Sequence, residues 1–263
     1  MDVLFYCITL SLCLIPGLIA RRYHLISKLG FWGFAFSSLI ILPSTGFIGL
    51  LILWLHFVII TASAKCKHAE KNEMGIVEDL TGRQWNRKMF CSMLPAVIFR
   101  GTHIFLIPGK TGIIFQPLIV AMISSLCTSA LFITTNQISR SRFRNLTMRY
   151  LTWLIMAFII FFINISLSQY FGVVEFPSFT DVVNLRDYSN YRLMSGLAII
   201  IGSLMANIVQ NIAVSAKNTL TQSSFLIFIG SFLGGLISGT IVLHFLLERW
   251  GWQLLWVDWF TVP

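Results

Sequence analysis

Charged residues are scarce in this sequence. Only 11% of the 263 residues are Asp, Glu, Lys or Arg, whereas a soluble domain carries about 25%. Because so little charge does not cover a water-facing surface, lipid is the expected solvent for most of the chain. The hydrophobic fraction of 56% agrees with this reading and excludes an ordinary soluble protein.

Acidic residues are the scarcer of the two charge types. Ten Asp and Glu stand against nineteen Lys and Arg, which gives a formal net charge of +9. In a soluble protein this excess would suggest nucleic-acid binding. Here the basic residues lie between apolar runs, a pattern typical of topology signals and of contact with anionic lipid. We therefore expect a lipid bilayer containing anionic lipids as the partner, and no nucleic acid.

Paired cysteines and familiar catalytic motifs are also missing. The five cysteines contain no CxxC pair, so neither a disulfide framework nor a structural zinc site is expected. The sequence has no G-x-S-x-G or HExxH motif and no pair of carboxylates within an apolar run. Hydrolytic enzymes with these motifs are therefore disfavoured, and no cofactor or metal is expected.

Long apolar runs predict eight membrane-spanning helices, because one span needs about 20 apolar residues. The break Pro-Ser-Thr-Gly at 43–46 predicts a tight hairpin between the second and third spans. No linker divides the chain, so residues 1–263 are expected to form one all-α, polytopic membrane domain. The predicted spans cover residues 3–20, 29–43, 47–64, 89–108, 112–135, 150–171, 193–216 and 225–247.

The distribution of basic residues predicts the orientation of these spans. With the N-terminus outside, fourteen Lys and Arg fall in cytoplasmic segments and four in outer segments. Short loops rich in Lys and Arg remain in the cytoplasm. We therefore expect a multi-pass protein of a bacterial-type inner membrane, with both termini on the outer side.

Arg100 and His103 lie inside the apolar run 89–108 and share one helical face, since they are three residues apart. A cation at membrane depth costs about 2.5 to 3.5 kcal/mol, so it usually faces protein or water and has a partner. Arg100 either extends to the outer headgroups, or binds an anionic group in a hydrated cavity or pairs with Glu175 or Glu248.

Several uncharged polar side chains also fall at membrane depth. Asn207, Gln210 and Asn211 are spaced i, i+3, i+4 and form one stripe, which either bonds neighbouring helices or lines a hydrated path. Among the histidines, only His103 and His244 are expected at a shared depth. The remaining polar positions of this kind are His56 and Asn164.

Small residues line one side of the predicted eighth span. Gly230, Gly234 and Ser238 form a stripe, with Gly235 and Gly239 beside it. Small side chains let another helix approach closely. The partner helix belongs either to the same chain or to a second copy in a homo-oligomer.

These observations leave three functional hypotheses. The first is a permease, channel or membrane subunit of a transport system, with a path along the amides of the seventh span. The second is a non-catalytic subunit that anchors or assembles a larger complex with partner membrane proteins. The third is a membrane enzyme acting on a lipid-linked anionic substrate, with Arg100 as phosphate clamp and His103 as acid or base.

Overall fold

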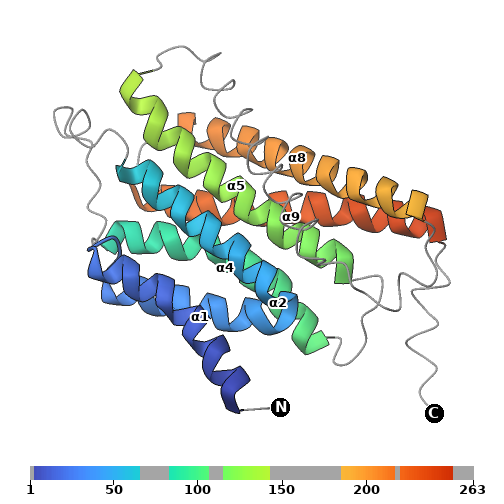
Figure 1. Ribbon diagram of the computed structural model, residues 1–263. Helices are drawn as coiled ribbons and strands as arrows, with labels where there is room; N and C mark the ends of the chain where they lie inside the picture. The colour runs from blue at the N-terminus through green and yellow to red at the C-terminus, as the bar shows by residue number, and fades with distance from the viewer. Residues whose placement is uncertain (1–2, 66–82, 107–114, 143–184, 217–219, 251–263) are drawn as a thin grey trace.

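A computed structural model describes residues 3–65, 83–106, 115–142, 185–216 and 220–250, which form α-helices without a strand (Figure 1). The predicted all-helical class is confirmed for these residues. Three helices contain apolar segments long enough to cross a membrane, namely Pro117–Thr134, Leu193–Ile212 and Ser224–Leu246. The helices are α1 (Val3–Arg22), α2 (Lys28–Lys65), α4 (Arg83–Leu106), α5 (Phe115–Arg142), α8 (Leu185–Ala216) and α9 (Leu220–Trp250).

Several helices extend beyond the predicted apolar spans. Helix α4 begins at Arg83 and α8 at Leu185, inside segments that were predicted as loops, and α5 continues to Arg142. Lys, Arg and Gln are good helix formers, so a helix can continue past the edge of its apolar run. Hydropathy locates the apolar segments, and the helices continue beyond them. The predicted span 150–171 lies outside the described residues.

The connection between α1 and α2 is short and hydrogen-bonded at both ends. The backbone N–H of Leu25 donates to Ala20 O at 2.8 Å, and that of His24 donates to Arg21 O at 3.1 Å. This pair of bonds closes a helix through one residue in the left-handed region, here His24 with φ of 52°. Ser27 Oγ then accepts from the N–H of Gly30 at 3.2 Å and caps α2.

Helix α2 folds back on itself. Residues 28–65 all have helical backbone conformation, including Pro43 to Gly46. However, the rings of Phe34 and Phe57 lie 5.0 Å apart, whereas 23 residues of straight helix span about 35 Å. The arms Lys28–Leu42 and Gly49–Lys65 are therefore antiparallel neighbours, and the helix axis reverses between them, where the sequence predicts the hairpin.

The helices pack as an elongated bundle with α4 and α5 at its centre (Figure 1). Helix α9 is antiparallel to α8, because Gly230 packs against Gln210 and Gly234 against Ala206. It is also antiparallel to α5, because Gly239 packs against Pro117 while Gly234 packs against Thr128. Helices α5 and α8 therefore run in the same direction.

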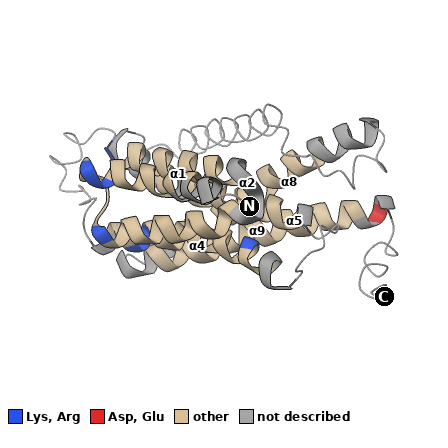
Figure 2. Ribbon diagram, turned by 60° about the horizontal axis from the view of Figure 1, so that its bottom comes forward, with Lys and Arg blue, Asp and Glu red and all other residues tan. Residues whose placement is uncertain are grey.

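Basic residues gather at one end of this bundle, where α1 ends and α4 begins (Figure 2). Arg21 and Arg22 occupy the last turn of α1, and Lys65 ends α2. Arg87 belongs to the first turns of α4 and is exposed. The described chain thus has one strongly basic end, as the distribution of Lys and Arg along the sequence predicts.

Candidate functional site

The polar side chains inside the bundle form a layer that crosses four helices. On α2, His56 is buried and its Nε2 lies 3.2 Å from Ser92 Oγ of α4. On α5, Ser129 donates to the carbonyl oxygen of Ser92 at 3.3 Å. Thr128 precedes Ser129 on α5, and its carbonyl oxygen accepts a hydrogen bond from Asn207 Nδ2 of α8 at 3.3 Å. These contacts place His56, Ser92, Thr128 and Asn207 at one level, which we call the polar layer.

The amides of α8 bond neighbouring helices through their nitrogen atoms. Asn207 Nδ2 also donates to Ser203 O at 3.0 Å. One turn further on, Gln210 Nε2 donates to Leu226 O of α9 at 3.0 Å and lies 3.5 Å from Ile227 O. Both side chains are buried, and the third predicted member, Asn211, is half-buried. Interhelical bonding is therefore the role that these nitrogen atoms perform.

Ser238 joins three helices one turn from the polar layer. Its Oγ lies 2.6 Å from Ser124 Oγ of α5 and 2.8 Å from Ala198 O of α8. Ser124 in turn donates to Gly234 O at 3.0 Å. A carbonyl inside a helix accepts this additional bond only where a neighbouring helix approaches closely, which the absence of a side chain at Gly234 permits.

The small-residue stripe of α9 packs within its own chain. A Cβ at Gly235 would lie 2.8 Å from Ala121 O of α5, and one at Gly239 would lie 3.2 Å from Pro117 O. A Cβ at Gly230 or Gly234 would overlap Gln210 or Thr128, respectively. These glycines therefore pack against α5, α8 and, through Phe99 next to Gly235, α4 of the same chain.

Arg100 is fully buried on α4, with 0% of its surface exposed. A side chain that extends to the headgroups keeps its charged end at the protein surface, so complete burial argues against that interpretation. The preceding residue, Phe99, stacks on Phe232 of α9 with ring centroids 5.2 Å apart. The following residue, Gly101, borders open space, because a Cβ there would meet nothing within 4 Å.

The predicted histidine pair is not assembled by the described side chains. His244 is exposed on α9, and the side chain of His103, like the whole of Asn164, lies outside the described residues. His56 is level with Ser92, eleven residues before His103, which corresponds to about 16 Å along the helix. This agrees with the expectation that His56 lies at a different depth from His103.

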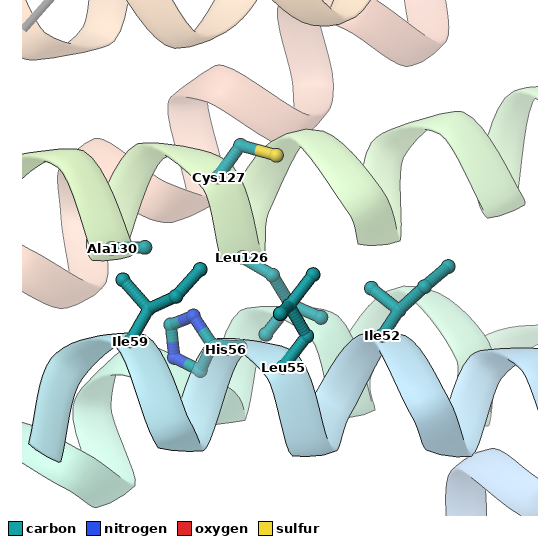
Figure 3. A pocket seen from close by; sticks show the side chains of 7 residues that line it. All are labelled: Ile52, Leu55, His56, Ile59, Leu126, Cys127 and Ala130. Atoms are coloured by element: carbon teal, nitrogen blue, oxygen red, sulfur yellow. The ribbon is translucent and has the colours of Figure 1, made fainter. Parts of the chain in front are cut away.

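A small cavity of about 10 Å³ adjoins the polar layer. Figure 3 shows its lining, in which Ile52, Leu55, His56 and Ile59 of α2 face Leu126 and Ala130 of α5. A volume of this size holds about one water molecule. It is too small for an organic substrate, so this cavity is not itself a transport path.

Ser92 is the member of the polar layer that sequence reasoning missed. It lies in the same apolar run as Arg100. A hydroxyl in such a run needs a hydrogen-bond acceptor, and this need was the signal in the sequence that could have identified Ser92.

Among the described residues, no group of three or more His, Cys, Asp or Glu could hold a metal ion. No family model, curated protein or solved structure matches this chain.

Proposed function

We propose that this chain is a permease, channel or membrane subunit of a transport system in a bacterial-type inner membrane. It crosses the membrane eight times, with both termini on the outer side. The three long apolar helices support membrane insertion. The basic end of the bundle supports the orientation, because Lys and Arg at short cytoplasmic loops fix it.

The observation that carries this proposal is the complete burial of Arg100 at apolar depth. An ionisable side chain inside a membrane bundle is by default a functional-site hypothesis, because such residues are rare there and mark substrate or ion pathways. Arg100 follows Ser92 of the polar layer by eight residues on α4, which is about 12 Å along the helix. In this position a fixed positive charge attracts anionic groups and repels cations, which gives a path charge selectivity.

The test is solute flux into proteoliposomes containing the purified chain. Stopped-flow light scattering would measure the entry rates of urea, glycerol, acetate and phosphate. Each rate would be compared between proteoliposomes and protein-free vesicles. We expect at least one solute to enter faster than in the protein-free control. Arg100→Ala should lower that flux tenfold or more while the extracted amount of folded protein stays constant, because the charge acts on the solute.

The matched control for this variant is Thr240→Val. Thr240 is exposed on α9, and within the part of the chain that the structure describes it donates only to its own helix, at Leu236 O. Its replacement should therefore leave flux unchanged. If Arg100→Ala removes the folded protein altogether, Arg100 acts in an internal ion pair. If it leaves both folding and flux intact, the selectivity role of Arg100 is wrong.

A second candidate, a subunit that anchors or assembles a larger complex, is favoured by the outer face of α8. The amide nitrogens of this helix are occupied within the chain, and its opposite face is apolar and exposed at Leu197, Ile201 and Met205. Absence of flux for every solute, together with no reaction of Asn207→Cys with a water-soluble thiol reagent, would favour this candidate. Flux with labelling would favour transport.

A further inference from the structure

The amide groups of Asn207 and Gln210 have fixed orientations. Each NH₂ group has two hydrogens, and each lies against two carbonyl oxygens: Thr128 O and Ser203 O for Asn207, and Leu226 O and Ile227 O for Gln210. Rotating either amide by 180° would turn its oxygen toward those carbonyls, which also accept hydrogen bonds. The amide oxygens must therefore point away from them.

Those two oxygens lack a donor among the described residues. Both Asn207 Oδ1 and Gln210 Oε1 are buried without a hydrogen bond there. The residues themselves are only 1% and 2% exposed. A buried acceptor left unsatisfied costs about 1 to 3 kcal/mol, and hydrocarbon offers no donor in place of water. Two such acceptors within one turn of α8 need an explanation.

Nearby hydroxyl groups do not supply the missing hydrogens. A hydroxyl has one hydrogen, and each of these hydroxyls has a backbone carbonyl as acceptor. Ser203 donates to Ile199 O at 2.7 Å, Thr128 to Ser124 O at 2.8 Å, and Ser231 to Ile227 O at 2.6 Å. These three hydroxyls, on α8, α5 and α9, are therefore committed to carbonyls of their own helices.

We propose that Asn207 Oδ1 and Gln210 Oε1 form a binding site for a small neutral hydrogen-bond donor, with one water molecule as its occupant. The two O–H groups of water match the two acceptors, and residues three apart on a helix lie on one face within reach of a shared ligand. An anion is excluded because both groups are acceptors. This inference rests on the proposed function, in which α8 lines a path, and it concerns the groups that hydrogen-bond to α8 and not the solute charge that Arg100 selects.

The direct test is an experimental structure of the full chain at a resolution that shows ordered water. We expect one density peak at hydrogen-bond distance, about 2.6 to 3.2 Å, from both oxygens. A dry contact between the oxygens and protein atoms would overturn the proposal. This structure is determined without a flux measurement. A dry site would therefore overturn the water site alone, and a failed transport assay would overturn the proposed function alone.

A second measurement distinguishes water from a monovalent cation. The unfolding midpoint in detergent would be compared in sodium, potassium and choline chloride at equal ionic strength. A neutral occupant predicts the same midpoint in all three salts. A higher midpoint specific to sodium or potassium would overturn the assignment of a neutral ligand.

The variants Asn207→Leu and Gln210→Met test whether the two oxygens share one ligand. If they do, the midpoint of the double variant should fall by less than the sum of the single losses, because the second change removes no further ligand. Gln210→Met combined with Thr240→Val is the matched control and should be additive. Additive losses in the Asn207 and Gln210 pair would contradict a shared occupant; if these variants fail to fold, the structure and the salt series still decide.

Discussion

Gly202 tests the close packing of α8 on α9, because no side chain fits there. A Cβ on Gly202 would lie 2.6 Å from Gly234 O and 3.1 Å from the backbone N of Ser238, and it would overlap Ser238 Oγ. The first distance is about 0.8 Å short of ordinary van der Waals contact. Since two of these atoms belong to backbone, Gly202→Ala must move α9 as a whole.

The expected loss of stability follows from three contributions. Overpacking costs about 1 to 3 kcal/mol, and disturbing the bond from Ser238 to Ala198 O costs about 0.5 to 1.5 kcal/mol more. Replacing glycine by alanine in a helix returns about 0.5 to 1 kcal/mol. Gly202→Ala should therefore lower the free energy of unfolding by about 2 kcal/mol.

Gly101→Ala is the matched control, because the same substitution there meets nothing within 4 Å. It should leave stability unchanged or raise it by up to about 1 kcal/mol. Both variants would be followed by circular dichroism during thermal unfolding in detergent. Equal midpoints for Gly202→Ala and Gly101→Ala would refute the packing of α8 on α9 described above.

Three further predictions concern the connections and the orientation. His24→Gly should raise the unfolding midpoint, because His24 occupies the left-handed region at a cost of about 1 kcal/mol; a lower midpoint would contradict the turn. Cysteines replacing Phe34 and Phe57 in a cysteine-free background should be joined by a short thiol cross-linker, detected by mass spectrometry; no cross-link would mean that α2 is straight. A reporter fused after Arg149 should remain cytoplasmic, and its export would overturn the predicted orientation.

The sequence was sufficient to predict the class of this fold, because apolar content depends on composition alone. It also predicted the reversal of α2 from the residues at 43–46, although the helix is not interrupted there. Helix ends do not follow from the predicted spans. Arg83 begins α4 and Arg142 ends α5, but an arginine is compatible both with a helix and with a loop. Hydropathy indicates whether a segment lies in lipid or in water, and it does not indicate the backbone conformation of that segment.

Within the candidate site, spacing predicted which residues share a face but not what they contact. The stripe of Asn207 and Gln210 is present, yet only the packing shows that its nitrogens bond α5 and α9. Likewise, the glycines of α9 predicted a close approach without naming Ala121 or Pro117 as neighbours. Contacts between helices distant in sequence depend on the arrangement of the bundle, which a periodic pattern does not encode.

The parallel course of α5 and α8 bears on the number of membrane crossings. Asn207 is level with Thr128, so the end of α5 at Arg142 and the start of α8 at Leu185 are separated by about 54 Å along the bundle. Both helices run in one direction, so these two helix ends lie at opposite ends of the bundle. The apolar run 150–171 lies in this interval, outside the described residues. The shared direction of α5 and α8 agrees with the proposal that the run 150–171 supplies one further span between them.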